Sequence, residues 1–140
     1  MSFVLRRIGP HDAALLEQVA KGVFDEPVRT DRLARYLHAP GHLMVLALAD
    51  GMVVGQCVGV IHHHPDKPSE LYVDEVGTAD AYLRRGIATA MLAELFAWGR
   101  ELGCDQAWLG TEAGNQAALA LYRRHAPIED ETMQFFVFRL

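Results

Sequence analysis

The residues best suited to chemistry lie in a short basic turn, Arg84 to Thr89, which reads Arg-Arg-Gly-Ile-Ala-Thr. The surrounding sequence predicts a passage from loop to helix. The first turn of a helix has backbone amides without internal acceptors and carries partial positive charge. Gly86 and Ala88 keep the approach to these amides open, and the two arginines add positive charge beside them. The turn is therefore predicted to bind an anionic group such as phosphate.

The turn alone is compatible with two interpretations: a phosphate site, or an ordinary loop-to-helix junction with arginines facing solvent. Short strings of this kind recur by chance. Two other nucleotide motifs are excluded, since a Walker loop requires a Gly-Lys-Ser/Thr ending and a dinucleotide fingerprint requires two further glycines. The elements on either side of the turn must therefore decide.

Periodicity and turn residues place the turn inside a strand-helix-strand-helix series. The predicted elements are a strand Glu70 to Thr78, a helix Arg84 to Leu102, a strand Gln106 to Thr111 and a helix Asn115 to Arg124. Strands joined through a helix are normally parallel, with a right-handed connection and the helix packed over both strands. The basic turn would then begin the helix that crosses between the two strands.

The remaining elements are predicted to be mostly antiparallel. They are a strand Phe3 to Ile8, a helix from Asp12 to about Phe24, a helix from Thr30 or Asp31 to the residues before Pro40, strands Leu43 to Ala49 and Met52 to His62, and a closing strand Thr132 to Arg139. Asp50-Gly51 joins the middle two strands as a tight hairpin, because both residues tolerate positive φ. The predicted fold class is α+β, a mixed and mostly antiparallel sheet with a central parallel βαβ unit flanked by helices.

The overall composition limits the class of protein. The 140 residues, 51% of them hydrophobic, suit one domain over residues 1–140. The formal net charge of −5 argues against a nucleic acid partner and suits a cationic amine. No run of about twenty apolar residues could span a bilayer and the N-terminus does not resemble a signal peptide, so we expect no membrane partner and a cytoplasmic location. Cys57 and Cys104 lack metal spacing and are expected to be reduced core residues.

The strand, basic turn and helix of Leu71 to Leu102 resemble the coenzyme-A-binding motif of the GNAT superfamily of N-acetyltransferases. The resemblance implies the GNAT fold and two groups of residues that bind acetyl-CoA. The end of the strand would contact pantetheine through Val76, Gly77 and Thr78. The turn would wrap the pyrophosphate with Arg84, Arg85, Gly86, Ile87, Ala88 and Thr89. The family's Gln or Arg at the opening position is Leu83 here, so the turn should act mainly through backbone amides and its two arginines.

Two residues extend the resemblance beyond this motif. The family pattern continues with an Asn at the start of the next helix and a Tyr two turns later, which here are Asn115 and Tyr122. Seven residues of helix place both on one face. Separately, Asn115 is explained as a helix N-cap and Tyr122 as a core residue. Together, after a turn of the right kind, they favour acetyl-CoA binding.

Other segments refine the resemblance. After Tyr122 many relatives carry a Gly-Phe pair, which is replaced here by Arg-Arg-His-Ala-Pro-Ile and implies a changed loop. Residues 23–28, 75–78 and 133–138 look most like the branch that includes type I aminoglycoside 3-N-acetyltransferases. The chain is therefore placed loosely nearest to that branch.

Acetyl transfer from a thioester requires a base for the amine, a donor for the carbonyl oxygen and a group near the leaving sulfur. Glu75 is the first candidate for the base, with Asp74 and Glu112 second, although a carboxylate at such a position can also be merely solvated or ion-paired. The Val76 N–H could meet the oxyanion, and Tyr122 would face the sulfur. Because a phenol is a weaker acid than a thiol, full proton donation by Tyr122 is uphill by about 2 kcal/mol, so a hydrogen bond to the thiolate would be the larger part of its role. No covalent acetyl-enzyme is required.

Two further groups of residues carry titratable side chains. The three consecutive histidines at positions 62–64 suggest a metal, but neighbouring strand residues point to opposite faces, so we predict no metal site. The histidines are expected to line the substrate end of the cleft or a solvent loop. Asp25, Glu26 and Asp31 lie where the family recognises its acceptor, which implies a cationic acceptor, with a solvated acidic face as the alternative.

These residues together predict an acetyl-CoA-dependent N-acetyltransferase that moves an acetyl group directly to a primary amine of a small cationic acceptor. A protein or peptide N-acetyltransferase and a non-catalytic acyl-CoA-binding module remain alternatives. The presence of both Glu75 and Tyr122 speaks against the silent module. The expected partner is a small-molecule amine, and the apolar closing strand could also pair across a two-fold axis in a homodimer.

Overall fold

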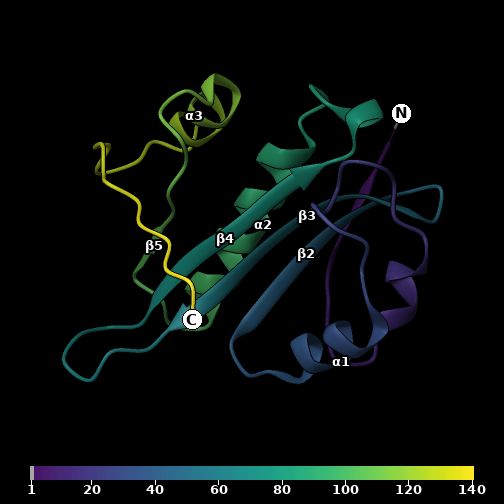
Figure 1. Ribbon diagram of the computed structural model, residues 1–140, viewed down its shortest axis with the longest axis horizontal. Coiled ribbons are helices and arrows are strands. Elements are labelled where there is room, and N and C mark those ends of the chain that lie inside the picture. The colour runs from purple at the N-terminus through teal and green to yellow at the C-terminus, as the bar shows by residue number, and fades with distance from the viewer. Residues whose placement is uncertain (1) are drawn as a thin grey trace. The chain divides into compact units, whose positions relative to one another are not determined.

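The computed structural model describes residues 2–140, and the chain divides into two compact units after Leu109. The first unit holds one five-stranded sheet (Figure 1). Its strands lie in the order β1 (Val4–Arg7), β2 (His42–Ala49), β3 (Met52–His62), β4 (Glu70–Thr78) and β5 (Gln106–Trp108). Neighbouring strands are antiparallel except for β4 and β5, which are parallel. The predicted α+β class, with one parallel pair in a mostly antiparallel sheet, is confirmed.

The β2–β3 hairpin turns at Asp50 and Gly51, as predicted. Their φ angles are 51° and 77°, and a two-residue hairpin turn needs such positive φ values to match the twist of its strands. The turn sets the register in which Ala49 lies opposite Met52. A dipeptide visible in the sequence thus sets the pairing next to the turn, and a β-bulge at Ala47/Leu48 shifts the register of the rest of the hairpin.

The core lies around β2 and β3. Every residue of β2 after His42 is buried, as expected for a strand covered on both faces. One face is covered by α2 (Ile87–Glu101), whose Met91, Leu92 and Leu95 are fully buried. The other face carries α1 (Thr30–His38) and the irregular segment of residues 18–28 (Figure 1). No helix within residues 2–140 is long and apolar enough to cross a membrane.

The helix predicted for residues 12–24 is wrong. Only a 3₁₀ helix, Ala13–Glu17, forms there. The next residues pair with β3 instead, since the Val53 N–H donates to the Gln18 carbonyl and the Ala20 N–H donates to the Val53 carbonyl, both at 2.9 Å. Their backbone groups are therefore committed to the sheet and cannot make helical hydrogen bonds.

The helix after the basic turn begins three residues later than predicted. Arg84 and Gly86 have φ values of 63° and 78°, and a right-handed helix excludes positive φ. Helix α2 therefore starts at Ile87, with Gly86 as its N-cap residue. The turn before it is an irregular segment whose shape depends on these two residues.

The second unit, residues 110–140, contains α3 (Gln116–Arg123), close to the predicted helix. The predicted closing strand Thr132–Arg139 is wrong, because no residue of this segment is in a strand. Its apolar side chains are highly exposed, from 71% for Phe136 to 88% for Phe135. Helix α3 is the only helix or strand described in residues 110–140, so the tail has no strand within its own unit to pair with.

Candidate active site

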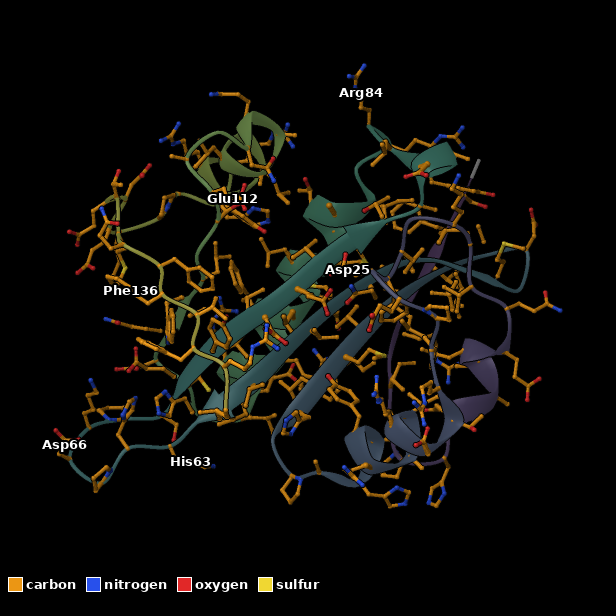
Figure 2. The ribbon with its side chains drawn as sticks, viewed as in Figure 1. Asp25, His63, Asp66, Arg84, Glu112 and Phe136 are labelled. Carbon is orange, nitrogen blue, oxygen red and sulfur yellow. The ribbon has the colours of Figure 1, made fainter. Side chains whose placement is uncertain are left out.

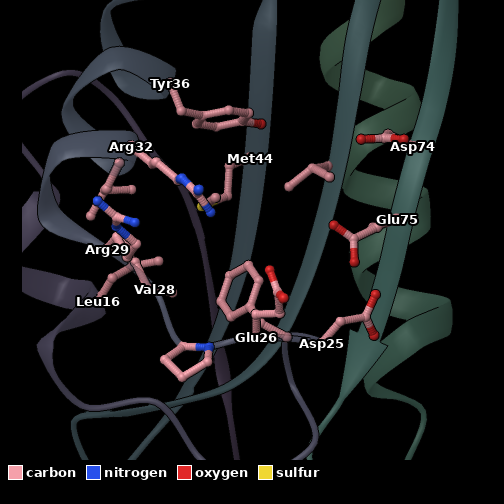
Figure 3. A pocket seen from close by; sticks show the side chains of 14 residues that line it. Leu16, Asp25, Glu26, Val28, Arg29, Arg32, Tyr36, Met44, Asp74 and Glu75 are labelled. Carbon is pink, nitrogen blue, oxygen red and sulfur yellow. The ribbon is translucent and has the colours of Figure 1, made fainter. Parts of the chain in front are cut away.

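A β-bulge in β4 brings two adjacent carboxylates to one side of the strand. Glu75 lies opposite Val58 and Val73 lies opposite Gly59, so Asp74 is an extra residue between two successive pairs. In a regular strand, adjacent side chains point to opposite faces, whereas a bulge re-aims them locally. Asp74 and Glu75 consequently both line one pocket (Figure 3).

The far edge of β4 is open beyond Tyr72. Strand β5 pairs only with Glu70–Tyr72 and ends at Trp108, three residues short of the predicted Thr111. Within residues 2–109, no other strand pairs with this edge. The Ala79 N–H donates to the Val54 carbonyl at 2.8 Å, so alternation along the strand directs the N–H groups of Val76 and Thr78 away from β3. Backbone donors are thus available at the positions expected to contact pantetheine.

A pocket of about 580 Å³ lies beside the two bulge carboxylates. This is a typical volume for a small-molecule site. Asp25, Asp74 and Glu75 lie on its β4 side, Arg29 and Arg32 on its α1 side, and Glu26 between them (Figure 3). The sequence identified all four carboxylates as candidates but missed both arginines, because charged residues on a short helix resemble a solvated face.

Glu75 has electrostatic surroundings that suit a base. Partial burial raises the pKa of its carboxyl, and the negative charges of Asp25 and Asp74 raise that pKa further. A carboxylate with a raised pKa holds a proton more readily than one in water. Of the three predicted bases, Asp74 shares this pocket and Glu112 belongs to the separate unit of residues 110–140.

The segment that carries Asp25 is fixed to the sheet by Gln56 and Gly77. The buried Gln56 donates from its Nε2 to the Val23 carbonyl at 3.2 Å. A Cβ on Gly77 would lie 2.1 Å from that same carbonyl oxygen, so only glycine allows the segment to approach so closely. The position of Asp25 beside Glu75 therefore depends on two residues that do not line the pocket.

The predicted pyrophosphate turn has the conformation of an exposed loop that ends in a helix N-terminus. No side chain caps α2, and a Cβ on Gly86 would meet nothing within 4 Å, so Gly86 is required for its positive φ. The Arg85 guanidinium lies 5.0 Å from the centre of the Tyr82 ring. Arg84 points away from the sheet (Figure 2), and Leu83 is 55% exposed. The turn thus offers two cationic side chains and the amides of a helix N-terminus.

Asn115 and Tyr122 belong to the second unit. Asn115 is the N-cap of α3, and its Oδ1 accepts a hydrogen bond from the Ala118 N–H at 3.0 Å. The N-cap role of Asn115 is thus present in the structure, and its role in binding acetyl-CoA stays a prediction. Tyr122 lies near the end of the same helix. Unlike Asp25, Asp74 and Glu75, which the first unit brings together, these residues keep their proposed roles from the resemblance alone.

The histidines at positions 62–64 lie outside the pocket. His64 Nε2 lies 2.7 Å from Glu70 Oε1, and His63 Nδ1 lies 2.7 Å from Ser69 Oγ. His62 ends β3, and His63 (Figure 2) and His64 lie in the β3–β4 connection, so none of the three lines the pocket. Within residues 2–140, no three His, Cys, Asp or Glu side chains are grouped as metal ligands.

Cys57 is buried in β3, and burial raises the pKa of its thiol to about 12. The reactive form of a cysteine nucleophile is the thiolate. A thiol with so high a pKa and no access to solvent is poorly suited to form an acetyl-enzyme.

Sequence comparison identifies one family. Residues 13–126 match the model of the Acetyltransferase (GNAT) family. The match covers most of both units and includes the bulge, the basic turn and α3. No curated protein sequence matches the chain significantly.

Solved structures share the fold along the whole chain. An aminoglycoside acetyltransferase, HMB0005, from an uncultured soil metagenomic sample is 23% identical, with a TM-score of 0.83 and 100% of both chains covered. AAC(6')-Iy in complex with a CoA bisubstrate analogue is 19% identical, with a TM-score of 0.80 and the same coverage. A ribosomal-protein-alanine N-acetyltransferase from Brucella melitensis biovar Abortus 2308 is 17% identical, with a TM-score of 0.74, and 99% of this chain and 100% of that chain are covered. At these identities the likeness shows the fold. The name AAC(6')-Iy gives position 6′ of the aminoglycoside, whereas the branch expected from the sequence is named for 3-N-acetylation.

Proposed function

Because the chain belongs to the GNAT family of acetyltransferases, we propose that it transfers the acetyl group of acetyl-CoA directly to a primary amine of a small acceptor. The observation that carries this proposal is the pair of bulge carboxylates, Asp74 and Glu75, facing a pocket of small-molecule size. Negative charge attracts a protonated amine, and the same carboxylates can then accept its proton. Structures of the same fold named as aminoglycoside acetyltransferases support a cationic small-molecule amine.

The open edge of β4 and the basic turn would hold acetyl-CoA. Val76, Gly77 and Thr78 would contact the pantetheine arm, since the N–H groups of Val76 and Thr78 point away from β3, at the far edge of β4. The turn of residues 84–89 would hold the pyrophosphate through the amides of the α2 N-terminus and its two arginines. Asn115 and Tyr122 would have the acetyl-CoA-binding roles that the family resemblance implies for them.

In the proposed reaction the neutral amine nitrogen attacks the thioester carbonyl carbon, and the carbon–sulfur bond breaks. Glu75 takes the amine proton directly or through a water molecule. The Val76 N–H donates to the carbonyl oxygen while that oxygen carries negative charge. Tyr122 donates a hydrogen bond to the departing thiolate, and the acetyl group remains on the amine as an amide.

Two alternatives predict different results in one assay. Purified protein would be mixed with acetyl-CoA and a panel of polyamines, aminoglycosides and peptide amines, and release of free CoA thiol would be followed with acetylated product identified by mass spectrometry. Turnover of small amines supports the proposal, and turnover of peptides alone supports a protein N-acetyltransferase. Binding of acetyl-CoA without turnover on any amine would support a non-catalytic module.

A further inference from the structure

The pocket carries opposite charges on its two sides, which a site for a purely cationic acceptor does not require. The β4 side presents Asp25, Asp74 and Glu75, whereas the other side presents Arg32 of α1 and Arg29, the N-cap residue of that helix (Figure 3). Both arginines line the same cavity as the predicted base. Any acceptor that fills this cavity must therefore satisfy groups of both signs.

The two arginines are not equivalent. Arg29 is held by Asp31, with Nε to Oδ1 at 3.1 Å and Nη2 to Oδ2 at 3.0 Å, so its charge is already matched. Arg32 forms no ion pair with any carboxylate of residues 2–140. The positive charge of Arg32 contributes only slightly to the lowered pKa of the Asp31 carboxyl. Figure 3 shows the Arg32 guanidinium directed toward the middle of the pocket.

Mostly apolar surface lies between the two charged sides, and Glu26 adds one further carboxylate there. Tyr36, Met44 and Val58 line the pocket between α1 and β4. The Tyr36 hydroxyl donates to the Leu43 carbonyl at 3.1 Å, which turns its polar group to the backbone and fixes the ring at the pocket wall. A ligand that matches this order has a charged group at each end and carbon between them.

We propose that the acceptor carries an anionic group, a carboxylate or a phosphate, in addition to its amine, and that Arg32 binds this group while the amine lies beside Glu75. The inference rests on the proposed function and narrows its substrate class. The planar guanidinium matches carboxylate and phosphate oxygens in two parallel hydrogen bonds. A diamine of the same length would instead place a second positive charge next to Arg32.

Matched acceptors test this directly. An ω-amino acid series from β-alanine to 6-aminohexanoate would be compared with the primary amides and with the diamines of equal length, and aminoalkyl phosphates would form the phosphate arm. We expect kcat/KM for the best anionic amine to exceed that of its amide by about 10-fold or more, as a charge-assisted contact provides. Comparison of kcat/KM for the ω-amino acids with kcat/KM for the aminoalkyl phosphates then shows whether the pocket prefers a carboxylate or a phosphate.

Variants on one helix assign the effect to Arg32. Arg32→Gln should lower kcat/KM for the anionic amine by about 10- to 100-fold and change that for the amide by less than about two-fold. Arg32→Glu should shift the preference toward the diamine. Arg35→Gln is the matched control, because Arg35 lies three residues further along α1 and does not line the pocket. This variant should change kcat/KM for neither substrate.

The outcomes separate this inference from the proposed function. If the wild-type protein acetylates diamines or amides as well as it acetylates anionic amines, or if Arg32→Gln slows all acceptors equally, the anionic subsite is refuted while acetyl transfer stands. If no amine is acetylated although acetyl-CoA binds, both the proposed function and the subsite are refuted.

Discussion

Glu75 is the residue whose surroundings bear most directly on the proposed reaction. Its carboxyl is next to a pocket, and both partial burial and the charges of Asp25 and Asp74 raise its pKa. If Glu75 is the base, Glu75→Gln should lower kcat by about 100-fold or more, within the usual range for loss of a general base, while acetyl-CoA affinity is retained. Steady-state kinetics with calorimetry of acetyl-CoA binding would measure the two effects separately.

The pH profile gives a second test of the same role. A base works when it is deprotonated, so activity should fall as the pH drops through the raised pKa of Glu75, at a pH above the ordinary glutamate value of 4.5. Asp25→Asn removes a negative charge that raises this pKa, so the acid limb of kcat/KM should move to lower pH. Asp66→Asn, in the β3–β4 connection, should leave the limb in place. A limb that stays fixed in Asp25→Asn would contradict the assignment.

Tyr122 is proposed to hydrogen bond to the thiolate as it leaves. Tyr122→Phe removes only the hydroxyl, so we expect kcat to fall by about 10- to 100-fold with the dissociation constant of acetyl-CoA changed by less than about two-fold. The hydrogen bond from Tyr122 to the sulfur strengthens as negative charge develops on that atom. Removing the hydroxyl should therefore lower kcat rather than weaken acetyl-CoA binding. Unchanged turnover in this variant would remove Tyr122 from the mechanism.

At the scale of elements, the basic turn should bind through its backbone and its arginines. We expect Arg84→Ala combined with Arg85→Ala to weaken CoA binding by about 10-fold, the effect of losing a charge-assisted contact. Leu83→Ala should change CoA affinity by less than about two-fold, because Leu83 supplies no polar side chain. Isothermal titration with CoA measures both, and a large loss in Leu83→Ala would show that this position has a packing role in the turn.

The contact between residues 18–28 and β4 should be needed for both stability and catalysis. Gly77→Ala would place a Cβ 2.1 Å from the Val23 carbonyl oxygen, so the segment that carries Asp25 must move. We expect the free energy of unfolding to fall by about 1–3 kcal/mol and kcat/KM to fall by at least about 10-fold. Chemical denaturation and steady-state kinetics would measure the two losses.

Gly9→Ala provides the control for this substitution. A Cβ on Gly9 meets only Asp12 Oδ2, at an ordinary contact distance of 3.6 Å, so stability and activity should change little. If Gly77→Ala behaves like Gly9→Ala, the close approach is not important for the position of the segment.

The parts of the fold that local sequence determines were predicted well. The Asp50-Gly51 turn, the bounds of β4 and the start of α1 at Thr30 all follow from residues that act on their own neighbours. Residues 12–24 were predicted as a helix from their apolar spacing, and Leu16 and Val23 are indeed buried. The backbone of this segment pairs with β3 instead, and a pairing with residues more than thirty positions away leaves no local pattern.

The candidate site was predicted in part for the same reason. The acidic residues could be identified from the sequence because a carboxylate is the natural base for an amine. The bulge that turns Asp74 and Glu75 to one pocket depends on how β3 pairs with β4, so it could not be predicted. The role of Arg32 as a pocket residue depends on where α1 lies on the sheet, which its own sequence does not encode.

For the whole molecule, the exposed tail predicts an assembly. Residues 133–138 expose five apolar side chains by 71–88%. A run of this kind in an extended segment favours pairing with another chain, so the homodimer expected from the sequence, in which each tail would add to its partner as a strand, stays a prediction. Light scattering after size-exclusion chromatography should give twice the chain mass of 15.5 kDa.

Substitutions in the tail test the basis of this dimer. Phe136→Asp with Phe138→Asp places charges on one face of the expected strand and should yield monomers, whereas Gln134→Ala should leave the dimer intact. A wild-type protein that is monomeric at micromolar concentration would contradict the prediction.

The bulge also gives β4 one position at which its length can change. Val73 and Glu75 lie opposite Gly59 and Val58, which are consecutive residues of β3. Loss of Asp74 would therefore join two segments that are already in register. A deletion elsewhere in β4 would shift the pairing and turn every following side chain to the other face. Removal of Asp74 would therefore shorten the strand by one residue and take one acidic group from the pocket, while the pairing of the rest of the sheet is preserved.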